Sequence, residues 1–175
     1  SFDGAESGTL LTVDSAIVSM VVSQSGLAAI GVEGRVIVID LSSRTVLQEL
    51  RAPGINKTLA FDATGLTLAS NTNTGTTYMW EYDGQSFNET YSLPGELGYS
   101  LAFQPVTNHL LIGLGNQVLV LNSKTGEEVY RIRQKGAVSR ITFLPDGTLL
   151  MVSQKSLQYY NATGLTSIMD GDLLK

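Results

Sequence analysis

Hydrophobic and polar positions along this chain alternate in short runs that repeat. Between residues 137 and 160 three apolar runs of strand length are separated by the turn sequence Leu144-Pro145-Asp146-Gly147 and by Gln154-Lys155. Proline presets φ at the second position of a β-turn, and Asp and Gly favour the positions that follow. The runs themselves are rich in β-branched and aromatic residues, which favour strands. The segment therefore predicts strand, turn, strand, turn, strand.

The same layout occurs three more times upstream. The apolar residue that ends the first run of each unit recurs at intervals of 39, 42 and 40 residues: Val22, Phe61, Phe103, Phe143. A polar residue ends each third run at intervals of 41, 41 and 39 residues: Asp40, Glu81, Asn122, Asn161. A fourth predicted strand follows each polar turn: Val46–Leu50, Phe87–Leu93, Glu128–Ile132, Leu165–Met169. These landmarks predict four copies of a four-stranded unit.

Four short antiparallel strands in each period of about 40 residues are typical of a β-propeller blade. One blade cannot bury both of its faces alone, so blades stack side by side around an axis. We therefore expect an all-β propeller of four-stranded antiparallel blades, with four blades and a leading outer strand. The predicted division gives the leading strand residues 1–13 and the four blades these ranges: 14–53, 54–97, 98–136, 137–175.

Two turn sequences resemble those of WD40-repeat proteins. Residues 61–65 (FDATG) and 143–147 (FLPDG) are similar to that family's turn between the first and second strands, and Trp80-Glu81 takes the place of its Trp-Asp dipeptide. The resemblance extends over residues 15–169 and implies a propeller that engages peptides or proteins. No Gly-His dipeptide precedes a blade, so the family's buried Asp-His-Ser/Thr-Trp network is not expected. Apolar packing is expected to hold the blades together.

Composition agrees with an all-β protein and narrows its function. Hydrophobic residues make up 43% of the chain and charged residues only 15%, with 18 glycines and no cysteine. A net charge of −5 argues against general nucleic-acid binding, and the lack of cysteine excludes disulfides and thiolate metal sites. No apolar run of membrane-spanning length and no signal peptide is recognised, so a cytoplasmic or nuclear protein is expected.

The two ends of the chain leave the number of blades open. Residues 2–13 resemble a polar turn and a fourth strand whose inner strands are missing. The last unit has its own predicted fourth strand, so this leading strand has no vacancy to fill. Either the chain belongs to a larger propeller whose other blades are absent or come from another chain, or four blades close on themselves or pair with a second copy as an eight-bladed ring.

The sequence offers little for catalysis, and we predict neither an enzyme nor a cofactor. His109 is the only histidine, and it is expected to be an exposed turn residue. A Ser-His-Asp arrangement would require it, yet no GxSxG motif is present. Metal sites built from Cys and His are excluded by their number. The polar residues that end the third strands are expected to cap their turns by accepting backbone hydrogen bonds.

A second column of residues lies three positions before each apolar landmark. It consists of Ser19, Thr58 and Ser100, and then Arg140 in the fourth unit. First strands line the central channel of a propeller, so these side chains are expected there. Arg140 is expected to reach the mouth of the channel or to pair with an acidic residue of the next blade.

The loops that join fourth strands to first strands share one face with the loops between second and third strands. Basic residues gather near this face, and with Arg131 they predict a positive patch for an acidic or phosphorylated partner segment. The candidate partner-binding residues are Arg51, Arg133, Lys135, Arg140 and Lys155.

Three functions are compared on this basis. The first is a non-catalytic scaffold that binds protein subunits or peptides within a larger complex, including another chain that completes the ring. The alternative is an extracellular or periplasmic propeller that binds a ligand or carbohydrate, because N-x-S/T sequons occur at Asn56, Asn88 and Asn161. The third is an enzyme whose site is completed by missing blades and includes His109.

Overall fold

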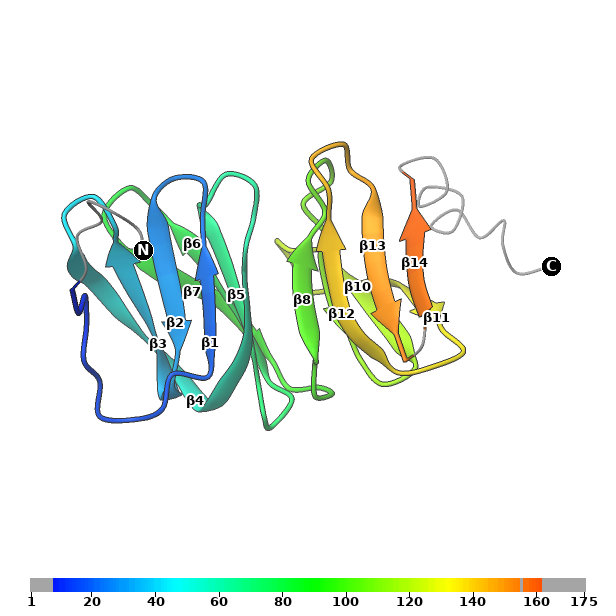
Figure 1. The fold of residues 1–175 in the computed structure, drawn as a ribbon, viewed down its shortest axis with the longest axis horizontal. Helices are drawn as coiled ribbons and strands as arrows, with labels where there is room; N and C mark the ends of the chain where they lie inside the picture. The colour runs from blue at the N-terminus through cyan, green and yellow to red at the C-terminus, as the bar shows by residue number, and fades with distance from the viewer. Residues whose placement is uncertain (1–7, 155, 162–175) are drawn as a thin grey trace, which may run out of the picture.

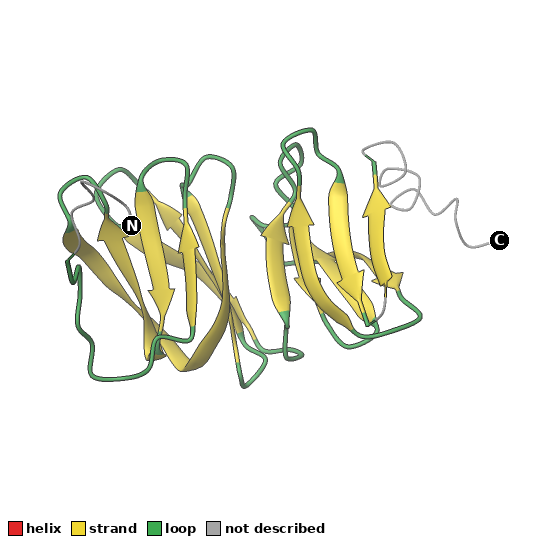
Figure 2. Ribbon diagram, in the orientation of Figure 1, coloured by secondary structure: helices red, strands yellow, loops and turns green. Residues whose placement is uncertain are grey.

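The computed structural model describes residues 8–154 and 156–161, and these residues form fourteen strands (Figures 1 and 2). The first blade contains β1 (Ser19–Val22), β2 (Leu27–Gly31), β3 (Glu33–Asp40) and the first part of β4 (Thr45–Phe61). The second contains the rest of β4, β5 (Thr67–Thr72), β6 (Thr77–Tyr82) and β7 (Phe87–Leu93). None of the described residues contributes a helix that is long and apolar enough to cross a membrane.

The third and fourth blades follow the same plan. The third contains β8 (Ser100–Phe103), β9 (Leu110–Gly113), β10 (Gln117–Leu121) and β11 (Glu128–Arg133), which form one four-stranded sheet. The fourth contains β12 (Val138–Phe143), β13 (Leu149–Ser153) and β14 (Ser156–Tyr160). All strand pairs are antiparallel. The all-β fold predicted from the repeats is thus confirmed, and the predicted strand at 165–169 lies outside the described residues.

Strand β4 runs without interruption from the first blade into the second. Its residues 45–55 pair with β3, and its residues 56–61 pair with β5. The corner between these two parts contains Pro53 and Gly54, and Gly54 has a φ of 106° that only glycine adopts easily. One strand therefore serves as the outer strand of blade 1 and the inner strand of blade 2.

Blades stack through apolar faces. Alternate residues of a strand point to opposite faces, so each blade has one face toward the preceding blade and one toward the following blade. Between blades 1 and 2, Ala29 and Val38 share a cluster with Leu68 and Trp80. Similar clusters join blades 2 and 3 around Met79 and blades 3 and 4 around Met151. The core therefore consists of layers between blades rather than of one central mass.

In blades 1 and 3 the polar residue that ends the third strand caps the following turn, as predicted. The Asp40 carboxylate accepts hydrogen bonds from the backbone amides of residues 42 and 43 at 2.7 and 3.2 Å. The side-chain carbonyl of Asn122 accepts from the backbone amides of residues 124 and 125 at 2.9 and 3.2 Å. In blade 2 the prediction of Glu81 is wrong, because β6 continues through Tyr82. There Asp83 caps the turn instead, accepting from residues 85 and 86 at 2.8 and 2.9 Å.

The prediction of a leading outer strand is not met by its described part. Residues 8–18 form no strand. Leu11 and Val13 instead pack on the face of blade 1 that points away from blade 2, over Ile30 and Ile37. The segment therefore covers part of an apolar face without extending any sheet.

Candidate partner-binding face

One edge of the molecule gathers the fourth-to-first connections and the second-to-third turns, and we call it the loop face (lower edge in Figure 1). The two kinds of connection are bonded to each other. The Asn73 side-chain carbonyl accepts from the Ile55 amide at 2.8 Å, and the Asn73 amide donates to the Ile55 carbonyl at 2.9 Å. The Gln134 amide donates to the Asn116 carbonyl at 2.8 Å. The backbone of this face is therefore well fixed.

Asn56 holds the corner of β4 from inside the protein. Its side chain is fully buried, and its amide nitrogen donates to the carbonyls of Val32 at 2.9 Å and Ala52 at 3.1 Å. Its carbonyl oxygen accepts from the Ser70 hydroxyl at 2.6 Å. A glycan cannot be attached to a buried amide that is used in this way, so the sequon at Asn56 gives no support to the carbohydrate-binding hypothesis.

Asn71 fixes the connection that leads into blade 3. It is also fully buried, and its amide nitrogen donates to the Thr77 hydroxyl at 2.9 Å while its carbonyl accepts from the Gly98 amide at 2.8 Å. The expectation that mainly apolar packing holds the blades therefore needs an addition. Buried amides and hydroxyls of blade 2 add a polar network, and the one hint in the sequence was the polar end of β5, SNT.

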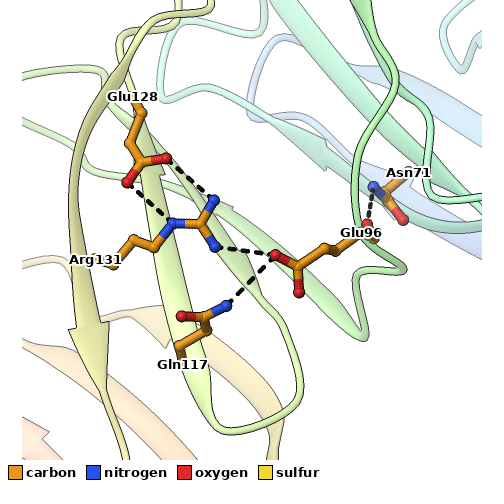
Figure 3. A network of polar contacts seen from close by, with 5 residues as sticks. All are labelled: Asn71, Glu96, Gln117, Glu128 and Arg131. Atoms are coloured by element: carbon orange, nitrogen blue, oxygen red, sulfur yellow. Dashed lines mark hydrogen bonds and ion pairs between the residues drawn. The ribbon is translucent and has the colours of Figure 1, made fainter.

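Arg131, which the sequence places in the positive patch, belongs to an ion-pair network (Figure 3). The Arg131 guanidinium contacts Glu128 with two nitrogens, at 2.9 and 3.0 Å, and Glu96 with a third at 3.0 Å. These hydrogen bonds, with Glu128 first, raise the pKa of Arg131. Glu96 lies in the connection to blade 3 and its carbonyl accepts from Asn71. Arg131 thus ties a loop in place and has its charge compensated.

The other predicted cations fall into separate places. Arg133 and Lys135 lie at the end of β11 and in the connection that follows, whereas Arg140 lies on β12 and Arg51 lies on β4 in blade 1. All four are exposed and form no ion pair with a described residue; Lys155 lies outside the described residues. The fold therefore keeps Arg133 and Lys135 together and leaves Arg51 two blades away. Their role in binding stays a prediction.

The column of hydroxyl residues does not line the channel as expected. The Ser19 hydroxyl donates to the backbone carbonyl of Asn56 at 2.6 Å, and the Ser100 hydroxyl accepts from the backbone amide of Ile141 at 3.0 Å. Each bond reaches the first strand of the following blade. The pleat of the strand explains the difference, since these positions share the face that looks toward the next blade.

The first strands of all four blades line a central groove of about 470 Å³. It opens toward the first-to-second turns, opposite the loop face, and its lining includes Asp62. The Asp62 carboxylate accepts from the amides of Leu66 and Thr67 at 3.0 and 3.1 Å and from the Thr64 hydroxyl at 2.9 Å. This acidic group therefore stabilises a turn. Within residues 8–154 and 156–161, no three His, Asp or Glu side chains are grouped to hold a metal ion.

His109 is half-buried rather than exposed, so that prediction is corrected. It precedes β9, and Nδ1 of its imidazole is buried without a hydrogen-bond partner among the described residues. Two tyrosines are likewise half-buried. Burial raises the pKa of both Tyr91 and Tyr130 to about 12, so both remain neutral at physiological pH.

No protein-family model matches the sequence, and no curated protein matches it significantly. Solved structures do match. The β-propeller domain of Cps50 (Swd1) from Myceliophteria thermophila has a TM-score of 0.71 at 15% identity and covers 85% of this chain and 54% of that chain. The WD40 repeats of RRP9 have a TM-score of 0.70 at 17% identity, covering 88% and 53%. Kuenenia stuttgartiensis hydrazine synthase has a TM-score of 0.74 at 16% identity, covering 92% and 51%.

These likenesses confirm the fold that the repeats predict. Two of the three structures are propeller or WD40 domains by name, and the third is an enzyme by name. Each match extends over most of this chain. The chain has the fold of a WD40-like β-propeller and spans about half the length of the structures it matches.

Proposed function

We propose that this chain is a non-catalytic propeller scaffold that binds protein partners through its loop face, within a larger complex. The observation that carries the proposal is the exposed pair Arg133 and Lys135, which extends from a loop face whose backbone is held by buried amides. WD40-like folds commonly serve as protein-interaction scaffolds. A fixed frame lowers the entropic cost of ordering a binding surface, which favours association.

The charges around this pair favour an acidic partner. Arg131, two residues before Arg133, already engages Glu96 and Glu128, so these two carboxylates are compensated. Arg133 and Lys135 have no such partner among the described residues, although the whole chain has a net charge of −5. An acidic or phosphorylated peptide segment offers the oxygen acceptors that guanidinium and ammonium groups bind best.

The acidic residue of the central groove supports the non-catalytic part of the proposal. A general acid or base needs a carboxyl group that is free to exchange a proton with a substrate. The Asp62 carboxylate instead accepts hydrogen bonds from three groups of its own turn, and Nδ1 of the His109 imidazole has no hydrogen-bond partner among the described residues. The scaffold function therefore rests on the loop face rather than on the groove.

Binding of fluorescent peptides tests the proposal. A phosphoserine peptide and a glutamate-rich peptide are titrated with the protein, with fluorescence anisotropy as the measurement at two salt concentrations. The unmodified chain should bind, and R133E/K135E should bind at least about tenfold more weakly, because two rim contacts worth about 0.5–1 kcal/mol each become repulsive. Higher salt should weaken the binding of the unmodified chain.

A matched control separates the loop face from overall charge. Lys124 is exposed in the turn between β10 and β11 at the opposite edge of the same blade, so K124E reverses one charge away from the loop face, where R133E/K135E reverses two. It should leave peptide binding within about twofold, on the scale of a remote surface charge. No peptide binding by the unmodified chain, or equal losses in K124E and R133E/K135E, would contradict the proposal.

A further inference from the structure

Each blade presents one pair of residues to the blade that follows it, at the loop-face end of its first two strands. We call this the forward pair. The residues of each pair are direct partners across the sheet: Ser19 with Gly31, Thr58 with Asn71, and Ser100 with Gly113. Each pair faces one residue at the start of the following blade, which we call the receiving residue: Asn56, Gly98 and Val138, respectively.

Forward pairs and receiving residues are complementary in size. A Cβ added to Gly31 would contact the Asn56 carbonyl and lie 3.0 Å from the Asn56 Cβ, and one added to Gly113 would lie 3.1 Å from a Val138 methyl group. These two small pairs thus meet larger receiving residues. Blade 2 reverses the order.

The larger pair of blade 2 meets a glycine. A Cβ added to Gly98 would lie 3.1 Å from the carboxamide carbon of Asn71. Protein interiors are close-packed, so two large groups at the same contact would force the blades apart. All three interfaces therefore follow one rule: a Ser/Gly pair receives a larger side chain, and a larger pair receives glycine.

Blade 4 has a forward pair that faces no described blade. Arg140 is the partner of Val152 across the sheet, at the place of Thr58 and Asn71, and both are large. On the same face Val152 pairs with Leu157, and Leu150 pairs with Tyr159. Leu157 and Tyr159 are 69% and 74% exposed. This face has the apolar character of the internal interfaces, and among the described residues no extensive contact joins β12 to β1.

Blade 1 has a receiving residue of the wrong size for this pair. The Val18 amide donates to the Gly31 carbonyl at 3.0 Å, as the Tyr99 amide donates to the Gly113 carbonyl at 2.8 Å. Ile17 therefore stands at the place of Gly98, and it is 52% exposed. An isoleucine suits a Ser/Gly pair, whereas Arg140 and Val152 require a glycine.

We infer that the open face of blade 4 docks a further propeller blade whose receiving residue is glycine, and that this blade is neither blade 1 nor its equivalent in a second copy of the chain. The same blade offers an acceptor, a carboxylate or carbonyl, to the Arg140 guanidinium, since a covered and unpaired charge is costly. Three internal interfaces supply the rule, and matching propellers about twice as long supply the room for more blades. The inference is independent of the proposed loop-face function.

A single substitution turns a copy of the chain into a surrogate for the missing blade. I17G gives blade 1 the glycine that the Arg140–Val152 pair requires, so two copies can close head to tail. Native mass spectrometry should show the unmodified chain at 18.7 kDa and I17G at twice that mass at the same micromolar concentration. The control V106G removes an apolar side chain that is 84% exposed in the β8–β9 turn, and it should remain a monomer.

The reciprocal variant tests the same rule from the other side. R140S/V152G gives blade 4 the Ser/Gly pair of blades 1 and 3, which receives the Ile17 of a second copy, so it too should form a dimer. Circular dichroism establishes that each variant is folded before its mass is measured. Dimerisation of either folded variant, with a monomeric unmodified chain, supports the inference. A dimeric unmodified chain overturns it, as do two folded variants that both stay monomeric.

Discussion

Blades 2 and 3 build the same backbone at the loop face from opposite kinds of side chain. The pairing of Thr58 with Asn71 and Thr77 corresponds to that of Ser100 with Gly113 and Val118. At four equivalent positions blade 2 has Asn56, Ser70, Asn71 and Thr77, where blade 3 has Gly98, Ile112, Gly113 and Val118. One blade uses buried hydrogen bonds and the other uses small and aliphatic groups.

Because the two blades are stabilised in different ways, different substitutions should destabilise them. In blade 2 the side chains of Asn56, Ser70, Asn71 and Thr77 are joined by buried hydrogen bonds, so this network is stable as long as these four members are present. In blade 3 a glycine leaves room for Asn71, so stability depends on the absence of a side chain. Loss of a partner should therefore damage blade 2, and gain of volume should damage blade 3.

The largest effect is expected from N56V, which places an aliphatic side chain in the network of blade 2. The Ala52 carbonyl and the Ser70 hydroxyl would lose the bonds to the Asn56 side chain, and the Val32 carbonyl would keep only the backbone amide of residue 56, at 3.4 Å. Each buried polar group left without a partner costs about 1–3 kcal/mol, so unfolding in urea should show a loss of about 3 kcal/mol.

The matched control for N56V is N116V, at an exposed position on the turn between β9 and β10. A change on the surface is expected to alter the free energy of unfolding by less than about 0.5 kcal/mol. A loss below about 1 kcal/mol for N56V, the value of one ordinary hydrogen bond, would mean that water or relaxation replaces the network.

A smaller loss is expected from G98N, which gives blade 3 the residue that blade 2 has. A Cβ at position 98 would lie 2.8 Å from an Ile112 methyl group and 3.1 Å from Asn71. Overpacking of this kind costs about 1–3 kcal/mol, so the free energy of unfolding measured in urea should fall by about 2 kcal/mol. In G115A the new methyl group meets nothing within 4 Å, and stability should hardly change. Equal effects in the two variants would refute the account of Gly98.

The sequence predicted what depends on local pattern. Apolar runs and turn residues such as Pro145 and Gly147 gave the strands, because turn chemistry and strand length are properties of neighbouring residues. The cap by Asp40 followed for the same reason, and the prediction failed at Glu81 because β6 extends one residue beyond it, through Tyr82. The continuous course of β4 through its corner was less visible, since Pro53 and Gly54 read as a break.

Contacts between blades were beyond such reasoning. Arg131 and Glu96 are 35 residues apart, and only the packing of β11 against the preceding connection brings them together. The position of Arg140 within its column was noticed from the sequence, yet its direction depends on which face of β12 looks toward a neighbour. The burial of His109 and Asn56 likewise depends on the stacking of blades, which no local pattern specifies.

The smallest effect distinguishes the turns after the third strands of the two blades. Blade 2 uses the Asp83 carboxylate, and hydrogen bonds from the amides of Ser86 and Gln85 lower its pKa below 3.8; blade 3 uses the Asn122 amide group, which does not titrate. A lowered folded-state pKa gives stability that is present above the unfolded-state value and is lost as pH falls through the folded-state pKa. Nuclear magnetic resonance should therefore show the amide protons of Gln85 and Ser86 shifting with a midpoint below pH 3.8, while those of Lys124 and Thr125 stay unchanged.

The variant D83N should abolish the first shift and leave the turn of blade 3 as it was. A midpoint at or above 3.8 would mean that the two amides do not hold the carboxylate in solution, and the two caps would then differ in chemistry without differing in their response to acid.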